Sequence, residues 1–404
     1  MKIVVLKFGG TSVGTVDRIK KVANIVAGYV KKGFKVIVVS SAMSGATNDL
    51  IKKSKNISSE FDLSEHDVLL AAGEQISCAL IAGRLNHLGY KSQSWMSWQI
   101  PILTEGKHKS SRIIKINKKK IFNYLKQGGI PVITGFQGVN NFNRITTLGR
   151  GGSDASAIMC AKFFKAKKCV IFTDVEGVYT TDPNNFKNAK KIKTISYEEM
   201  LEMTSLGAKV MQPQSIQDAR LNRIEIDVKS SFVNKNGTSI TKRKNIFRNK
   251  IITGLTSTKN DAKITIAGVK DKPGVAASVF KPLSQNQVNV DMVVQTSSSN
   301  NSETDITFTI KSEDLSKTTK LIKQNKKIKY RDLIVNKNVS KISIIGVGMV
   351  TTPGVTYRMF QTLAEKKINI LVISTSEIKI SVLINKKNIK KALSALHKEF
   401  KLNS

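Results

Sequence analysis

The chain of 404 residues is poor in cysteine, proline and aromatic residues. Its 3 cysteines form no Cys-x-x-Cys pair, so we expect free thiols in a reducing cytoplasm. The first apolar stretch ends at Lys7, too early for a secretory signal peptide. No uninterrupted apolar stretch approaches the roughly 18 residues of a membrane span. We therefore expect a cytoplasmic protein with two or three folded domains.

Acidic residues are scarce relative to basic ones, 29 against 66, which gives a net charge of +37. Such a charge is typical of proteins that bind nucleic acids or anionic membranes. Only 11 of the basic residues are arginine, however, and the lysines are scattered without interleaved aromatic residues. We interpret them as a solvated surface that attracts anionic substrates such as nucleotides, and we expect no nucleic-acid or membrane partner.

Histidine is also rare, and none of the 4 histidines shares a motif with another or with a glycine-rich loop. The sequence therefore offers no nucleophile–base pair. A carboxylate acceptor needs none, because it is already ionised near neutral pH. Phosphoryl transfer to a carboxylate requires only positioning and charge neutralisation, so these absences favour a carboxylate kinase.

Apolar segments alternate with amphipathic ones up to about residue 230. The expected strands are Ile3–Lys7, Val36–Ser40, Ile130–Thr134, Cys169–Thr173 and Ile226–Ser230. The expected helices include Val16–Lys31, Asp67–Leu88 and Ser153–Phe164. This order predicts a mostly parallel sheet between helices, an αβα sandwich whose ligands bind beyond the carboxyl ends of the strands.

Two similar stretches follow a polar, basic segment at 234–250. KITIAGV at 263–269 corresponds to KISIIGV at 341–347, and each is followed by Pro-Gly-Val. Each copy predicts a strand, a turn, a helix (Val275–Gln285 or Val355–Lys366) and a further strand (Asn289–Gln295 or Asn369–Thr375). A unit of this size has a marginal core, so we expect the copies to pack on each other or on a second chain.

The motif KFGGTSVG (7–14) places Lys7 at the end of the first strand, before Gly9 and Gly10. Glycines let backbone N–H groups approach an anion, and the lysine supplies a point charge for phosphate oxygens. A plain strand-to-helix turn is the alternative, but the hydroxyls that follow favour phosphate binding.

Two further segments offer substrate-binding groups. In SSAMSGATND (40–49), Ser41 and Thr47 suit a carboxylate or phosphate, although a helix cap is an equal alternative. In LAAGEQIS (70–77), Glu74 stands among apolar residues on several helix faces. A buried acid is costly unless paired, which favours contact with an ammonium group over a surface position.

The segment TLGRGGSDASA (147–157) is the most informative. Arg150 can bind a carboxylate with two hydrogen bonds, and Ser153 and Asp154 open the next helix. Asp154 needs a cationic partner, for which a substrate ammonium would serve. A simple helix cap by Ser153 is the alternative.

The segment TDVEGVYTTDP (173–183) follows a strand, so Thr173 and Asp174 lie where a nucleotide or metal could bind. Tyr179 and Asp182 follow in a loop, where a turn at Asp182-Pro183 is the alternative. Lys209 in GAKVMQP adds a second cation for phosphates.

These motifs, with GFQGVN and in this order, resemble aspartate kinase, and the two repeats resemble its paired ACT domains. The resemblance covers essentially the whole chain and is to the monofunctional type. It implies an amino-acid-kinase domain at 1–245 and βαββαβ ACT domains at 262–337 and 338–404. It also implies transfer of phosphate from ATP to the β-carboxylate of L-aspartate, the first step toward lysine, threonine and methionine.

The resemblance assigns roles to matching residues. Lys7 and Asp154 would be catalytic, and aspartate would be bound by Ser41, Thr47, Glu74, Arg150, Ser153 and Asp154. ATP would be held by Lys7, Phe8, Gly9, Gly10, Thr173, Asp174, Tyr179, Asp182, Lys209 and Val210. Mg²⁺ would bridge the phosphates, with no side-chain ligand assigned.

Lysine, threonine or both would be the feedback effectors, bound between ACT modules of a homodimer or tetramer. The matching positions are Asp271, Pro273, Gly274, Ala276, Ala277, Asn289, Asp291, Gln295, Asn369, Ile370, Thr375 and Ser376. The chain departs from the family at Gln75, where arginine is usual, at Ser97–Pro101, and at the extra turn residues Thr351 and Thr352.

Other interpretations remain at this point. A glutamate or N-acetylglutamate kinase has the same fold, but Glu74 and Asp154 do not suit an acylated amine, and the doubled repeat fits neither enzyme. An inert amino-acid sensor would not need Lys7, Arg150 and Asp154 together.

Overall fold

The computed structural model describes residues 1–404 except 207–209, 243–250, 298–302, 326 and 404. The chain divides into two compact units. The first contains Met1–Val178 and Lys191–Phe247, and the second contains Tyr179–Lys190 and Arg248–Ser404. Residues 179–190, which we expected in the kinase domain, therefore group with the second unit.

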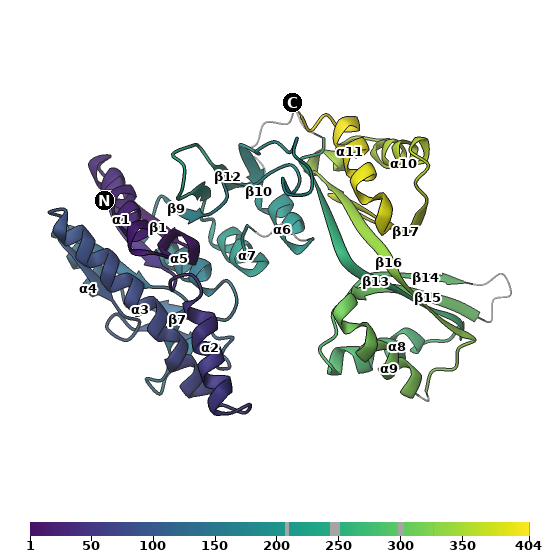
Figure 1. Ribbon diagram of the computed structural model, residues 1–404, viewed down its shortest axis with the longest axis horizontal. Helices are drawn as coiled ribbons and strands as arrows, with labels where there is room; N and C mark the ends of the chain where they lie inside the picture. Colours follow the sequence, from purple (N-terminus) through teal and green to yellow (C-terminus); the bar gives the residue numbers. More distant parts are fainter. Residues whose placement is uncertain (207–209, 243–250, 298–302, 326, 404) are drawn as a thin grey trace. The chain divides into compact units, whose positions relative to one another are not determined.

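The first unit is built on an eight-stranded sheet (Figure 1). Its strands, in spatial order, are β10 (Thr194–Ser196), β12 (Thr238–Thr241), β11 (Ile226–Ser230), β9 (Lys168–Thr173), β1 (Ile3–Phe8), β2 (Lys35–Ser40), β6 (Ile130–Thr134) and β3 (Ser92–Trp95). All described pairs are parallel except β11 with β12, which confirms the expected mostly parallel sheet. A smaller sheet contains β5 (Arg112–Ile116), β4 (Ile102–Glu105), β7 (Gln137–Val139) and β8 (Ile145–Thr147).

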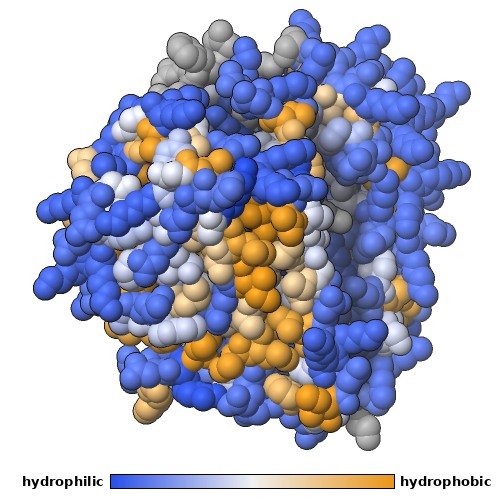
Figure 2. Space-filling view, turned by 60° about the vertical axis from the view of Figure 1, so that its left-hand side comes forward, coloured by the Kyte–Doolittle hydropathy of each residue, from blue (hydrophilic) through white to orange (hydrophobic). Residues whose placement is uncertain are grey.

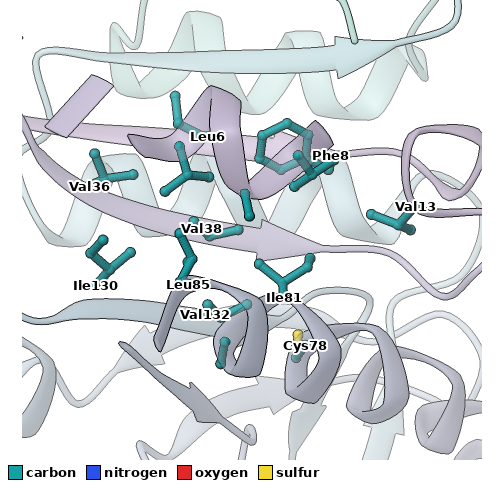
Figure 3. Packing of buried hydrophobic residues seen from close by; sticks show 14 of the residues in the cluster. Leu6, Phe8, Val13, Val36, Val38, Cys78, Ile81, Leu85, Ile130 and Val132 are labelled. Atoms are coloured by element: carbon teal, nitrogen blue, oxygen red, sulfur yellow. The ribbon is translucent and has the colours of Figure 1, made fainter. Parts of the chain in front are cut away.

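Helices cover both faces of the larger sheet. They are α1 (Val16–Lys31), α2 (Ala46–Ile57), α3 (Leu63–His87), α4 (Lys119–Lys126), α5 (Gly152–Phe163), α6 (Tyr197–Ser205) and α7 (Pro213–Asn222). Leu6 and Phe8 pack in one core with residues of α1 and α3, as Figure 3 shows. Because side chains alternate along a strand, Lys7 points to the opposite face, where it meets α5.

Among the described residues, one helix has the length and apolar composition needed to cross a membrane, and that helix is α3. Half of its most apolar window is buried inside the protein, and Ile81 and Leu85 pack against the sheet (Figure 3). Its outer face exposes Ile76 and Leu80, and Figure 2, which turns the first unit forward, shows a hydrophobic band among hydrophilic residues. The buried residues of α3 therefore belong to the core of a folded domain.

The second unit contains the two repeats on one six-stranded sheet. Its order is β14 (Val290–Ser297), β15 (Glu303–Lys311), β13 (Gly254–Lys270), β16 (Asp332–Ile345), β18 (Lys379–Asn385) and β17 (Ile370–Ser376). The first repeat carries α8 (Val275–Gln285) and α9 (Leu315–Gln324), and the second carries α10 (Val355–Glu365) and α11 (Ile389–Glu399). The predicted repeat helices and strands are thus present, within one residue at most ends.

The strands β13 and β16 are long enough to serve both repeats. The first part of β13, Gly254 to Thr258, pairs with Ile345 to Lys341 of β16. Its Leu255 packs in the core of the second repeat, beside Met359. The second repeat therefore takes one of its strands from residues that precede the first repeat, which is an exchange of a strand between the repeats.

Candidate active site

The carboxyl ends of four neighbouring parallel strands carry the predicted site residues. Lys7 lies at the end of β1, Ser41 follows β2, and Thr173 ends β9. The end of β6 is followed by Gly135, where a methyl group would lie 2.9 Å from the Ser153 Cβ. The sheet topology thus gathers these segments at one edge, as predicted.

Lys7 and Asp154 form an ion pair of 2.6 Å between Nζ and Oδ1. Both side chains are nearly buried, with exposed fractions of 11% and 10%. Asp154 lies in the first turn of α5, which begins at Gly152 after the left-handed Gly151. The cationic partner that we expected Asp154 to need is therefore Lys7, within the protein.

Glu74 is buried on α3, with 3% of its surface exposed. Its Oε1 accepts a hydrogen bond of 3.0 Å from the Ala42 backbone, whereas Oε2 is buried without a hydrogen-bond partner in the described structure. Burial raises the pKa of the Glu74 carboxyl to about 8, although the nearby Lys7 charge lowers it in part. A buried carboxylate oxygen without a hydrogen-bond partner can accept a hydrogen bond from a substrate ammonium group, whose charge would favour the ionised form of Glu74.

The helix α3 holds the loop after β2 at close range. A methyl group at Gly73 would lie 2.7 Å from the Ala42 Cβ, so only glycine allows this approach. Ser77, one turn along α3, donates to the Ser41 carbonyl at 2.7 Å. We did not predict a role for Ser77, although its spacing of three from Glu74 places both on one helix face.

The glycines of the first loop have mainly local roles. The Gly9 N–H donates to the Phe172 carbonyl at 3.1 Å, so it does not serve as the predicted anion donor. A methyl group at Gly10 would lie 3.0 Å from the Ala42 carbonyl oxygen. The Phe8 ring is buried and stacks on Phe172 with centroids 4.8 Å apart, and the Phe8 carbonyl accepts from the Ser41 N–H at 3.1 Å.

Arg150 stands between two glycines with positive φ, Gly149 (74°) and Gly151 (76°). The loop joins β8 to α5, and the Arg150 residue is exposed. Thr47 is half-buried in the first turn of α2, and Ser153 is 9% exposed at the start of α5.

The predicted nucleotide residues are divided between the two units. Asp174 follows β9 in the first unit and accepts a hydrogen bond of 3.1 Å from the Thr173 hydroxyl. Tyr179 and Asp182 belong to the second unit, where Asp182 accepts from the Asn184 backbone at 2.9 Å in a local turn. Val210 is half-buried in a turn, and Lys209 lies outside the described residues.

The predicted effector positions lie at matching places in the two repeats. Gly274 caps α8 with a φ of 88°, and the flanking Asp271 and Pro273 are exposed. The remaining positions lie in the first turn of α8, in the edge strands or one residue before them, namely Ala276, Ala277, Asn289, Asp291, Gln295, Asn369, Ile370, Thr375 and Ser376. Asp291 is paired with the buried Lys341 of β16, an intramolecular partner that we did not predict.

No group of three or more His, Cys, Asp or Glu side chains suitable for a metal occurs in the part of the chain described. Mg²⁺ typically keeps several waters and binds through one or two carboxylates plus substrate phosphates, so it does not require such a cage.

Two known protein families match this chain. Residues 2–230 match the amino acid kinase family, and residues 264–325 and 342–400 match the ACT domain. An aspartokinase of Bacillus sp. (strain MGA3) is 40% identical over 404 residues, which cover 100% of this chain and 98% of that protein.

Solved structures of aspartokinases are also similar to this chain over nearly its whole length. E. coli aspartokinase III in complex with aspartate and ADP (R-state) is similar with a TM-score of 0.78 at 25% identity, covering 98% of this chain and 99% of that one. Its complex with lysine and aspartate (T-state) gives a TM-score of 0.80 at 25% identity, covering 99% and 100%. Because the similarity extends from the first strand through both ACT regions, the chain belongs to the aspartate kinase family.

Proposed function

We propose that this aspartate kinase transfers the γ-phosphoryl group of ATP to the β-carboxylate of L-aspartate, giving 4-phospho-L-aspartate and ADP. The proposal rests on the buried Lys7–Asp154 pair and on the buried Glu74 oxygen that has no hydrogen-bond partner in the described structure. It combines a fixed positive charge for a phosphoryl group with a buried negative group for an ammonium.

Residues of opposite charge bind the two charged groups on the α-carbon of aspartate. Glu74 binds the α-ammonium of aspartate, and Arg150 binds the α-carboxylate through its guanidinium. A β-carboxylate oxygen then forms a bond to the γ-phosphorus as the bond to the β-phosphate oxygen breaks. The acceptor is already ionised, so no proton has to be removed.

Asp154 orients the Lys7 ammonium, which neutralises charge on the transferring phosphoryl oxygens. Ser41, Thr47 and Ser153 complete the aspartate pocket, and Thr173, Asp174, Tyr179, Asp182, Lys209 and Val210 serve the nucleotide. Mg²⁺, when bound, would supply positive charge that neutralises the nucleotide phosphates.

The test is ATP-dependent formation of aspartyl hydroxamate by the purified protein. Lys7→Ala and Asp154→Ala should each lower kcat by at least about 100-fold, because electrostatic stabilisation is lost. Lys2→Ala, which removes an exposed lysine from the same end of the chain, should leave the rate unchanged. Activity near the wild-type level in both site variants would refute the assignment.

Regulation is proposed from the ACT matches and from the lysine complex of E. coli aspartokinase III. Lysine, threonine or their mixture should inhibit the enzyme, acting in the cytoplasm on the pathway to lysine, threonine and methionine. The edge strands β14 and β17 offer unpaired backbone groups through which the chain would form a homo-oligomer. Two effector sites in such an assembly would differ chemically, because Gln295 corresponds to Thr375.

An inhibition panel of lysine, threonine, methionine and their mixtures tests this regulation. Gln295→Ala or Asn369→Ala should weaken inhibition at least fivefold, whereas Gln324→Ala, an exposed position on α9, should not. Inhibition that is equal in all three variants would contradict the placement of the effector sites.

A further inference from the structure

We propose that Asp67 is a positioning residue for aspartate binding, because it fixes the backbone from which Arg150 extends. The inference rests on the proposed function, in which Arg150 binds the α-carboxylate. Asp67 lies on α3, two turns before Glu74, and belongs to none of the motifs recognised in the sequence.

The Asp67 carboxylate is fully buried, with 0% of its surface exposed, and accepts four hydrogen bonds. Oδ1 accepts from the Thr147 hydroxyl at 2.6 Å. Oδ2 accepts from the backbone N–H of Thr147 at 3.0 Å and of Lys109 at 3.1 Å, and contacts His108 Nδ1 at 2.7 Å. Because the Asp67 carboxylate is fully buried and already makes these four polar contacts, it does not bind a substrate directly.

These bonds fix Thr147 on three sides. Its N–H and hydroxyl are held by Asp67, and its carbonyl accepts from the Ser111 N–H at 3.0 Å. Thr147 is the last residue of β8 and stands three positions before Arg150. The single buried carboxylate thereby joins α3, the loop 107–111 and the start of the loop 148–151.

The fixed segment continues toward Arg150. The Leu148 N–H donates to the Phe136 carbonyl at 2.9 Å. A methyl group at Gly149 would lie 2.7 Å from the Lys109 carbonyl oxygen, so the two loops are in direct contact. Arg150 is exposed but extends from a backbone held against its neighbours on both sides.

Asp67 acts through Thr147, because its oxygens are already occupied by four donors. Two-bond recognition of a carboxylate by arginine requires the guanidinium in one place, and a displacement of about 1 Å can cost up to 100-fold in rate. A network that only stabilises the fold would affect both substrates alike. A network that places Arg150 should affect aspartate selectively.

Thr147 allows a test without removing the buried charge. Thr147→Val keeps the shape of the side chain but loses the hydroxyl bond to Asp67, whereas Thr147→Ser retains a hydroxyl. We expect Thr147→Val to raise KM for aspartate about tenfold and to change KM for ATP less than twofold, with Thr147→Ser close to the wild type.

The neighbouring Thr146 is a matched control, since it is equally buried but bonds the Thr104 hydroxyl at 2.6 Å. Thr146→Val should lower the melting temperature without a selective change in KM for aspartate.

Each variant is also made together with Arg150→Ala. If Thr147 acts through Arg150, Thr147→Val should have no further effect on KM for aspartate in that background. An unchanged KM for aspartate in Arg150→Ala alone would overturn the proposed role of Arg150. In two other outcomes, Arg150→Ala alone raises KM for aspartate while Thr147→Val leaves it unchanged, or changes it equally with and without Arg150. Either result would support the role of Arg150 and contradict the positioning role of Asp67.

Discussion

Glu74 is a buried acid whose surroundings leave one carboxylate oxygen without a hydrogen-bond partner in the described structure. Its other oxygen bonds the Ala42 backbone. Desolvation favours the neutral acid, and the ammonium of bound aspartate would favour the carboxylate. Substrate binding and proton release from Glu74 should therefore be coupled.

This coupling predicts a pH dependence of aspartate affinity. Burial raises the pKa of Glu74 in the free protein to about 8, so the ionised form that binds the ammonium gains population as pH rises toward that value. KM for aspartate should fall roughly tenfold between pH 7 and pH 8.5, whereas KM for ATP should not follow it. A coupled ADP-release assay over this range measures both constants.

The variant Glu74→Gln should raise KM for aspartate and make it independent of pH over the same range. Glu65→Gln alters an exposed acid on the same helix and should retain the wild-type profile. An unaltered pH profile in Glu74→Gln would show that another group carries the titration.

The segment 179–190 is the element whose position the sequence alone did not reveal. The Thr180 hydroxyl lies 2.9 Å from Nε2 of His397 on α11, and Phe186 contacts the same ring with centroids 4.6 Å apart. The Leu255 N–H donates to the Thr180 carbonyl at 2.6 Å. These contacts attach the segment, which contains the proposed nucleotide residues Tyr179 and Asp182, to the rest of the second unit.

His397 should make the stability of this attachment depend on pH. Burial lowers the pKa of His397 below its usual 6.5, although a hydrogen bond with Asn403 raises it in part. The neutral ring is therefore favoured in the folded protein. The stability it contributes is present above pH 6.5 and is lost as pH falls through the lowered pKa.

The melting temperature of the wild type should accordingly drop more steeply below pH 6.5 than that of His397→Gln. Each kcal/mol of lost stability corresponds to about 2–4 °C for a unit of this size. Differential scanning calorimetry from pH 5 to 8 measures the difference, with His87→Gln, an exposed histidine at the end of α3, as the control. Parallel curves for wild type and His397→Gln would exclude a role for this ring in the pH response.

Periodicity and glycine placement were enough to predict most elements. The helix α1 has the predicted ends, Val16 and Lys31, because its apolar residues repeat at helical spacing between polar termini. The position of Lys7 at a strand end likewise follows from local pattern. Its pairing with Asp154 does not, because the two residues are far apart in sequence and meet only through packing of α5 on the sheet.

Asp67 shows the same limit. In the sequence it is one more acid near a helix start, and its importance comes from donors some 40 and 80 positions away. The exchange of β13 between repeats was also hidden, because Leu255 precedes the recognisable repeat and joins the core of the other copy.

The whole molecule combines a kinase unit with a regulatory unit on a strongly basic chain. The net charge of +37 should concentrate anionic substrates without selecting among them. Selection must come from the pocket, in which we propose that Glu74 binds the free ammonium and Arg150 binds the α-carboxylate. The substrate of a glutamate kinase has a longer side chain than aspartate. The substrate of an N-acetylglutamate kinase also lacks the free ammonium group.

The most direct measurement is therefore kcat/KM for ATP-dependent phosphorylation of four acceptors: L-aspartate, N-acetyl-L-aspartate, L-glutamate and N-acetyl-L-glutamate. The account predicts that L-aspartate exceeds each of the others by at least about 100-fold, because the acetylated acceptors bring no positive charge to the buried Glu74 and glutamate misplaces the reacting carboxylate. A larger kcat/KM for either glutamate compound, or equal use of the acetylated and free forms of aspartate, would contradict it.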